Sequence, residues 1–241
     1  MSLRDCFDRH KGRYVGKIDH FFDVYERYFS AYRGRPVNLL EIGVYRGGSL
    51  EIWREYFGPQ ATIHGIDINP DAINHAPVGS KIHIGSQGDP DFLKSVASAH
   101  GPFDIVIDDG SHLMPHQIDT FETLYPLMHE RGIYVCEDAF TSYWREYGGQ
   151  LGGATTFIEH AKRLVDDLHA FWAVDEGVKP TLFTTTTRAV HFYSGTVVFE
   201  REPVTEPVYA VRRNENLQKI SIADLKRSAS ENTKQREIHR G

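Results

Sequence analysis

Hydrophobic and polar positions alternate along this chain in two distinct patterns. Short stretches rich in apolar and β-branched residues, of the kind that form parallel strands, occur at residues 37–44, 61–68, 81–85, 103–108 and 132–138. Around these runs, apolar residues recur at helical spacing and predict helices at residues 20–32, 49–57, 89 onward and 117–128. Strands and helices that alternate across short loops predict an α/β fold with a doubly wound, Rossmann-like sheet.

The pattern changes after residue 138. A long helix is predicted at residues 155–173, and two strands at 188–193 and 196–200 complete the sheet with an antiparallel strand. Beyond Pro207 the chain is polar and basic, with a weak helix predicted at 217–225 and no order from Ser228. We therefore divide the chain into an N-terminal helical segment (1–35), a central domain (36–205) and a basic tail (206–241) that is either partly disordered or packed in an oligomer.

The composition narrows the classes of function. The 241 residues carry a formal net charge of −6, which argues against a general binder of nucleic acid or of acidic membranes. No apolar stretch reaches membrane-spanning length, and the N-terminus lacks the apolar core of a secretory signal. The two cysteines, Cys6 and Cys136, are far apart and lack metal-binding spacing. A cytoplasmic protein is therefore expected.

Two of the predicted strands run directly into acidic residues. The apolar residues 105–107 lead into Asp108-Asp109-Gly110-Ser111-His112, and the apolar residues 133–136 lead into Glu137-Asp138. Because the carboxyl ends of parallel strands face the ligand crevice of an open α/β sheet, these groups are expected to converge. Carboxylates without cysteines suit Mg²⁺ or Mn²⁺, and a histidine beside them suits a general base.

The loop after the first strand favours a nucleoside ligand. It reads Glu41-Ile42-Gly43-Val44-Tyr45-Arg46-Gly47-Gly48-Ser49, in which glycines precede a helix whose free N–H groups attract an anionic group. The spacing does not match G-x-G-x-x-G, so a nicotinamide oxidoreductase is disfavoured. Asp67 ends the second strand, where a carboxylate can accept both ribose hydroxyls. The alternative for Asp67 is a cap on the turn before Asn69-Pro70.

Three further motifs tighten this interpretation. They are Ile84-Gly85-Ser86-Gln87-Gly88-Asp89, then Ile107-Asp108-Asp109-Gly110-Ser111-His112, and Glu137-Asp138 followed by Thr141-Ser142-Tyr143-Trp144. With the first loop and Asp67, they resemble the class I S-adenosylmethionine-dependent methyltransferases. The branch they resemble, over about residues 10–199, contains the metal-dependent sugar O-methyltransferases of macrolide and other antibiotic pathways and the cephalosporin-hydroxylase-like methyltransferases.

The resemblance implies both a topology and a cofactor site. The implied sheet order is 3-2-1-4-5-7-6, with the seventh strand antiparallel. The residues that it implies for S-adenosylmethionine are Glu41, Gly43, Tyr45, Ser49, Asp67, Gln87 and Asp108.

The same resemblance assigns metal binding to Asp109, Glu137 and Asp138, since strands four and five are neighbours in the implied order. Without a cation these carboxylates could not all stay ionised at close range. A divalent ion lowers the pKa of an acceptor hydroxyl, and His112, three residues beyond Asp109, is placed to take the proton. The alternative is that His112 only bonds the loop backbone; His116 is a second candidate base.

The acceptor side of the site is less closely specified. Tyr143 and Trp144 are expected to form part of an acceptor wall, with a packed loop anchor as the alternative. The glycine-rich stretch 148–153 has the character of a lid. Lys17 and His20 are placed to close over the cofactor or to face a partner subunit.

One position departs from the resemblance. Relatives often carry a histidine shortly after Glu-Asp, where this chain has Ala139-Phe140. A different choice of acceptor is one expected consequence.

The leading hypothesis is therefore a Mg²⁺-dependent O-methyltransferase that acts on a hydroxyl of a small molecule, expected to be a glycoside sugar. A catechol acceptor is the alternative within enzymes, since vicinal hydroxyls also chelate a metal. A cofactor-binding scaffold without turnover is the alternative outside them. No nucleic-acid or membrane partner is expected, because the basic residues Arg212, Arg213, Lys219, Lys226 and Arg227 lie in the tail. A homo-oligomer is expected from the N-terminal aromatic residues.

Overall fold

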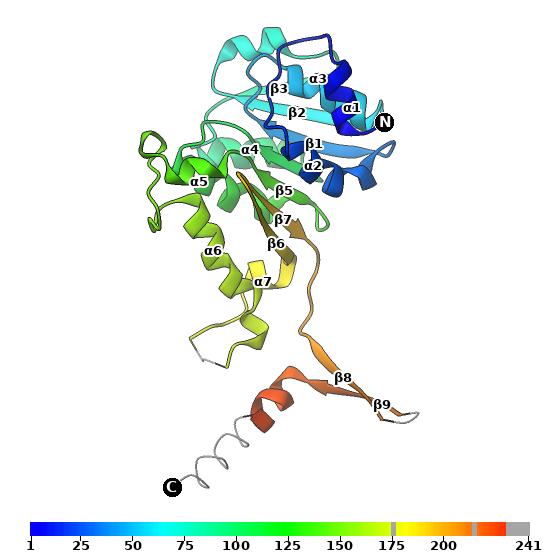
Figure 1. The fold of residues 1–241 in the computed structure, drawn as a ribbon, viewed down its shortest axis with the longest axis vertical. Helices are drawn as coiled ribbons and strands as arrows, with labels where there is room; N and C mark the ends of the chain where they lie inside the picture. Colours follow the sequence, from blue (N-terminus) through cyan, green and yellow to red (C-terminus); the bar gives the residue numbers. More distant parts are fainter. Residues whose placement is uncertain (175–176, 214–215, 230–241) are drawn as a thin grey trace.

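The computed structural model describes residues 1–174, 177–213 and 216–229 and contains the predicted sheet (Figure 1). Its strands are β1 (Val37–Ile42), β2 (Ala61–Asp67), β3 (Ser80–Ile84), β4 (Ile105–Asp108), β5 (Ile133–Cys136), β6 (Thr187–Tyr193) and β7 (Thr196–Arg201). They are ordered β3-β2-β1-β4-β5-β7-β6. The first five are parallel, and β7 is antiparallel to both of its neighbours. The predicted fold class and strand order are confirmed.

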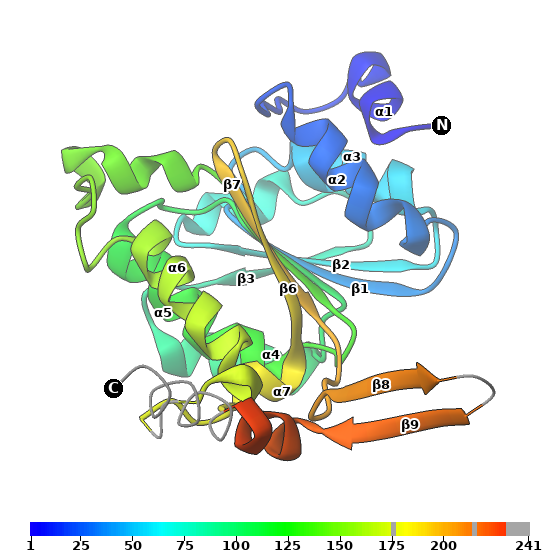
Figure 2. The same cartoon turned by 60° about the horizontal axis from the view of Figure 1, so that its bottom comes forward.

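Helices cover both faces of the sheet (Figure 2). Successive residues of a strand point to opposite faces, so apolar strand residues pack against helices on both sides. Leu39 packs in one hydrophobic cluster with α1 (Leu3–Arg9), α2 (Phe21–Phe29) and α3 (Gly48–Phe57). Leu40 packs in the other with α4 (Pro90–His100), α5 (Met114–Leu124) and α6 (Phe157–Leu168). The short helices that precede β6 are η1 (Ser30–Tyr32), η2 (Pro70–His75), η3 (Tyr125–Leu127), η4 (Ala139–Tyr143), η5 (Arg145–Tyr147), η6 (Ala170–Trp172) and α7 (Leu182–Thr186).

The helix predicted at 217–225 is wrong over most of its length. Residues Asn216–Ser221 form β9, which pairs antiparallel with β8 (Val208–Arg213), and helix begins only at residue 222 and continues to 229. The β-branched and aromatic residues of β8 offer a partner strand, and tertiary pairing overrides a weak helical pattern. Residues 228–229, expected to be without order, are helical, and residues 230–241 lie outside the described part of the chain.

The carboxyl ends of β1, β2, β4 and β5 meet at one edge of the sheet, which is where the predicted site residues follow in sequence. Within the described residues, no helix combines the length and the apolar character needed to cross a bilayer.

A histidine cluster away from that edge predicts acid sensitivity of the fold. His64 is 1% exposed; its ring is nearly parallel to that of His83, with centroids 5.3 Å apart, and meets the ring of His100 at a tilt, with centroids 5.0 Å apart. Burial, with repulsion from His83, His100 and Lys81, lowers the pKa of His64 to about 4. The unfolded chain takes up this proton near pH 6.5, so this contribution to stability is present above pH 6.5 and is lost as the pH falls towards 4.

We therefore expect His64→Phe to remove about 2 kcal/mol of the stability difference between pH 7 and pH 5. The measurement is the free energy of unfolding in urea at both pH values for wild type and variant. Equal losses in the two proteins would contradict the prediction.

Candidate active site

A cavity of about 490 Å³ opens at the carboxyl ends of β1, β2 and β4. Its lining residues are Ile42, Gly43, Tyr45, Ile66, Asp67, Ile68, Gly85, Ser86, Gln87, Asp109, Gly110, Ser111, His112 and His116. Of the residues predicted for the cofactor, Gly43, Tyr45, Asp67 and Gln87 belong to this lining, whereas Glu41, Ser49 and Asp108 do not.

Gly43 is the point at which the loop after β1 meets the loop after β4. Its φ is +93°, and a Cβ there would stand 2.0 Å from the carbonyl oxygen of Asp109. Only glycine allows this approach, since a side chain would force the two loops apart. The close approach shapes a cradle in which a flat, polar ligand fits against backbone, as a nucleoside cofactor requires.

Asp67 both lines the cavity and organises the loops beside it. Its Oδ2 accepts hydrogen bonds from the backbone N–H of Val44 (3.0 Å) and Tyr45 (2.8 Å), and its Oδ1 accepts one from Asn69 (2.8 Å). The turn-capping role considered as an alternative is therefore present in the structure. A carboxylate offers about four acceptor positions, so Asp67 retains capacity for a ribose hydroxyl.

Glu41 and Ser49 bond to each other beneath the first loop. Glu41 is fully buried and accepts hydrogen bonds from Ser49 Oγ (2.7 Å) and Trp53 Nε1 (3.1 Å). Burial raises the pKa of Glu41, and the nearby Lys17 ammonium opposes that rise. These contacts tie α3 to β1 behind the cavity.

Asp108 acts on the cavity through Gln87. Gln87 Nε2 donates to Asp108 Oδ1 (3.0 Å), while Gln87 Oε1 accepts from the backbone N–H of Ser111 (2.6 Å). Burial raises the pKa of Asp108 to about 7, against the lowering effect of hydrogen bonds from Gln87 and Tyr134. The pair fixes the amide of Gln87 at the wall of the cavity.

The predicted metal residues divide into two groups that share Asp109. Ligand atoms of Asp109, His112 and Asp138 lie within 4.8 Å of one another, and so do those of Glu41, Asp109 and Glu137. The predicted combination of Asp109, Glu137 and Asp138 is thus distributed over both groups. Because the donors are carboxylate oxygens with one imidazole nitrogen and no thiolate, they fit a hard divalent ion such as Mg²⁺ or Mn²⁺.

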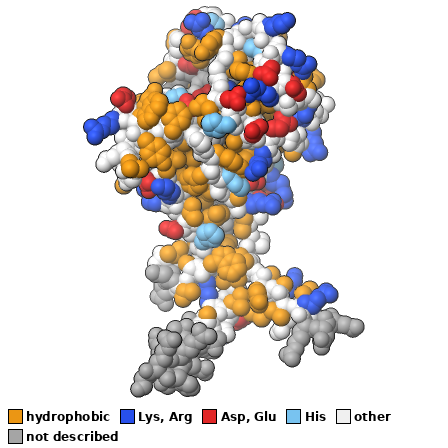
Figure 3. Space-filling model, viewed as in Figure 1, with side chains coloured by type: hydrophobic (Ala, Val, Ile, Leu, Met, Phe, Trp, Pro, Cys, Tyr) orange, Lys and Arg blue, Asp and Glu red, His pale blue; other side chains and the backbone are white. Residues whose placement is uncertain are grey.

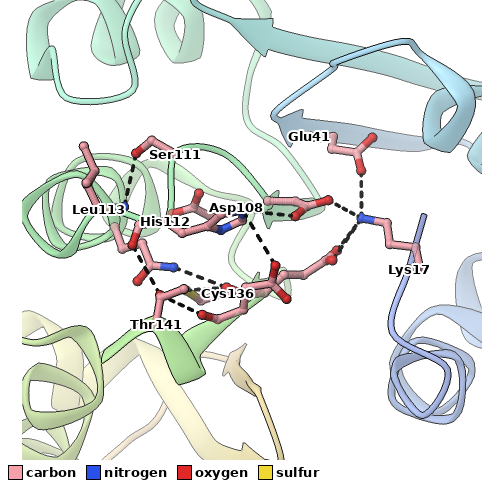
Figure 4. A network of polar contacts seen from close by, with 12 residues as sticks. Lys17, Glu41, Asp108, Ser111, His112, Leu113, Cys136 and Thr141 are labelled. Carbon is pink, nitrogen blue, oxygen red and sulfur yellow. Dashed lines mark hydrogen bonds and ion pairs between the residues drawn. The ribbon is translucent and has the colours of Figure 1, made fainter. Parts of the chain in front are cut away.

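Lys17 lies against the second group (Figure 4). Its Nζ is 2.6 Å from Asp109 Oδ2, 2.8 Å from Glu137 Oε1 and 3.4 Å from Glu41 Oε1. Burial alone would lower the pKa of Lys17, but attraction to Asp109, Glu137 and Glu41 outweighs it and holds that pKa well above its usual value. Burial and the charge of Asp109 raise the pKa of Glu137 to about 8, while Lys17 opposes that rise.

His112 contributes the imidazole of the first group. Its Nε2 is 3.9 Å from Asp109 Oδ1 and 3.7 Å from Asp138 Oδ2, and its buried Nδ1 has no hydrogen-bond partner among the described residues. Tyr45, His112 and Asp138 are the non-glycine residues with positive φ in the described part of the chain. Backbone strain of this kind costs about 1–3 kcal/mol per residue and gathers at functional sites.

Aromatic residues that follow β5 lie outside the cavity, near the surface. Tyr143 and Trp144 are about half exposed and do not line the cavity. The centroid of the Trp144 ring is 5.0 Å from that of Phe140 and 6.1 Å from that of Tyr147. The Tyr147 ring centroid in turn is 6.2 Å from that of His112. Tyr147 was not among the residues expected at this site. The signal for it was its position on the same loop as Trp144.

The other candidates near the site have defined contacts. His116 Nδ1 is 2.9 Å from Ser111 Oγ, so this second candidate base bonds the loop that carries His112. His20 Nε2 is 2.7 Å from the carbonyl oxygen of Ser194 and thereby ties the N-terminal segment to the β6–β7 turn. In the predicted lid, a Cβ on Gly149 would stand 2.2 Å from the carbonyl oxygen of Thr141, so this end of the segment packs closely on η4.

Comparisons with known proteins find similarity to methyltransferases. Residues 40–139 match the family model of a methyltransferase domain. The 8-demethyl-8-(2-methoxy-alpha-L-rhamnosyl)-tetracenomycin-C 3'-O-methyltransferase of Streptomyces olivaceus is 40% identical over 220 residues, which cover 85% of this chain and 55% of that protein. The L-olivosyl-oleandolide 3-O-methyltransferase of Streptomyces antibioticus is 39% identical over 64% of this chain and 42% of its own length.

A solved structure has a similar fold. The MycE methyltransferase of mycinamycin biosynthesis, in complex with Mg, SAH and mycinamycin VI, superposes with a TM-score of 0.76 and 32% identity, over 84% of this chain and 54% of that one. The chain spans about half the length of the curated relatives it matches.

Proposed function

This chain belongs to the methyltransferase family, in the branch of the sugar O-methyltransferases of glycosylated natural products, and from that premise we propose that it moves a methyl group from S-adenosylmethionine to a sugar hydroxyl of a small glycoside with the help of Mg²⁺ or Mn²⁺. The observation that carries the proposal is the position of Asp109. It lines the cofactor cavity and also belongs to both groups of potential metal ligands. Cofactor and metal would therefore meet at one residue.

The chain's own residues then have separate tasks. Gly43, Asp67 and Gln87 would hold the cofactor, whereas Asp109 and Asp138 would hold the metal and Glu137 would stay paired with Lys17 beside them. When bound, S-adenosylmethionine supplies a methyl group already activated on a sulfonium, and the divalent ion supplies positive charge that acidifies the acceptor hydroxyl.

Proton transfer would fall to His112. Nε2 of His112 faces the carboxylates of Asp109 and Asp138, so it is placed to take the hydroxyl proton and to keep the resulting charge beside those groups. The rings of Trp144 and Tyr147 would cover the acceptor and exclude water.

The test uses the purified chain with S-adenosylmethionine and a panel of glycosylated polyketides and catechols. We expect a methylated glycoside, loss of turnover with EDTA and recovery with Mg²⁺. Turnover only on catechols would change the acceptor class. Cofactor binding in calorimetry without turnover on any acceptor would favour a scaffold.

The hairpin β8–β9 supports a further part of the proposal, a homo-oligomer. Isolated two-stranded hairpins are marginal in water, yet this one extends beyond the domain (Figure 1). Val208, Tyr209 and Leu217 on it are each more than half exposed, and hydrophobic side chains are visible on the arm in Figure 3. Residues 208–241 carry eight Lys and Arg against four Asp and Glu, whereas residues 1–207 carry 19 against 29. The basic arm therefore suits the acidic domain of a second copy.

We expect removal of residues 206–241 to convert an oligomer into a monomer. The measurement is the molar mass by light scattering during size-exclusion chromatography. The full-length triple variant Val208→Ser/Tyr209→Ser/Leu217→Ser is expected to shift the mass in the same direction. A wild type that is already monomeric, or a truncated chain of unchanged oligomeric state, would contradict this part of the proposal.

A further inference from the structure

Lys17 is held in a way that is unusual for a lysine. Its side chain is 5% exposed, and its ammonium contacts Glu41, Asp109 and Glu137. An ammonium has three N–H donors, so each of the three carboxylates can receive one. Figure 4 shows Lys17 entering this group from the N-terminal segment, on the side opposite His112.

The segment that carries Lys17 is fixed on both sides of it. Before Lys17, the backbone N–H of Arg13 donates to Glu51 Oε2 (2.9 Å), and a Cβ on Gly48 would stand 2.3 Å from the carbonyl oxygen of Tyr14. After it, His20 bonds the carbonyl oxygen of Ser194. These contacts fix the backbone around Lys17 and thereby fix the position of its ammonium.

Charge explains why a cation is needed there. Glu41 and Glu137 are almost completely buried, and with Asp109 they bring ligand oxygens to within 4.8 Å of one another. Three carboxylates at this range cannot all remain ionised unless positive charge lies between them. In the structure that charge is the ammonium of Lys17.

Asp109 divides its two oxygens between the two groups. Oδ2 contacts Lys17, while Oδ1 faces Nε2 of His112. Lys17 therefore contacts Asp109 on the side of Glu41 and Glu137, whereas Asp109 Oδ1, His112 and Asp138 form the side that would take a divalent ion.

We propose that the ammonium of Lys17 is a resident cation that occupies the group of Glu41, Asp109 and Glu137, so that this centre takes one divalent ion and not two. The inference rests on the proposed function in that it concerns the metal expected there. Lys17 is on this account a positioning residue that orients Asp109 and Glu137 before the ion arrives.

The experiment counts bound ions in the absence of cofactor and acceptor. Wild type, Lys17→Ala and the charge-conserving control Lys17→Arg are titrated with Mn²⁺, and free Mn²⁺ is followed by electron paramagnetic resonance. Wild type and Lys17→Arg are expected to bind the same number of ions, and Lys17→Ala one more per chain. Without metal, Lys17→Ala is expected to melt several degrees lower than Lys17→Arg and to recover when Mn²⁺ is added.

The outcomes separate this inference from the proposed function. If wild type binds no Mn²⁺ and Lys17→Ala binds one, the metal dependence fails and the role of Lys17 stands. If Lys17→Ala and Lys17→Arg bind equal numbers of ions, the role of Lys17 is overturned. Should Lys17→Ala fail to fold, the double variant Lys17→Ala/Glu137→Gln is expected to fold, because it removes the negative charge of Glu137 together with the positive charge of Lys17. A double variant that does not fold would also overturn the inference.

Discussion

Replacement of Asp109 by Asn is expected to lower kcat for methyl transfer by about 1000-fold, which corresponds to about 4 kcal/mol of transition-state stabilisation. The amide keeps the shape of the side chain but removes the charge that both ligand groups share. Lys17 also loses its closest partner, at 2.6 Å. The measurement is steady-state kinetics with saturating S-adenosylmethionine and Mg²⁺, together with the Kd for Mn²⁺, which is expected to rise more than tenfold.

The matched control for this variant is Asp91→Asn. Asp91 is an exposed aspartate near the start of α4 that pairs only loosely with Lys94 (3.5 Å), so its variant is expected to keep kcat within twofold. An Asp109→Asn protein that retains full, EDTA-insensitive activity would refute metal assistance and leave the cavity as a cofactor site alone.

The sequence predicted the sheet well because its central strands, such as β4 and β5, are buried on both sides and are almost entirely apolar. It predicted the roles of individual polar residues less completely, and strand geometry explains why. Leu39 packs against α1–α3, so Glu41, two residues later, faces the same side and lies under α3 with Ser49. The side chains of adjacent residues at the end of a strand point in different directions. Asp108 therefore bonds Gln87, while Asp109 lines the cavity.

Long-range contacts lie outside what a local pattern can indicate. Lys17 is 92 residues from Asp109 and 120 residues from Glu137 in the chain, and no spacing rule connects them. Its place in the site depends on how the N-terminal segment folds back over α3 and the β6–β7 turn. The hairpin β8–β9 was missed for a related reason, since each strand is defined by its pairing with the other.

Replacement of His112 by Asn is expected to lower kcat by 10²- to 10⁴-fold, the usual contribution of a general base. Asparagine is the suitable replacement because it tolerates the left-handed backbone conformation of this residue, with φ of +58°, and retains a polar side chain that cannot accept the proton. His116→Asn is the matched control, since His116 bonds Ser111, and it is expected to lose less than tenfold.

The Mn²⁺ affinity of His112→Asn distinguishes two possible roles of His112, general base and metal ligand. His112 lies in the same group as Asp109 and Asp138, so its imidazole is near enough to be a metal ligand as well as a base. A base that receives the acceptor proton can be removed with the Kd for Mn²⁺ changed less than threefold, because the carboxylates still hold the ion. A ligand cannot, since loss of one donor from so small a set weakens binding at least tenfold. A large rise in that Kd, with the loss of kcat reversed by excess Mn²⁺, would assign His112 to the metal and leave the proton to another acceptor.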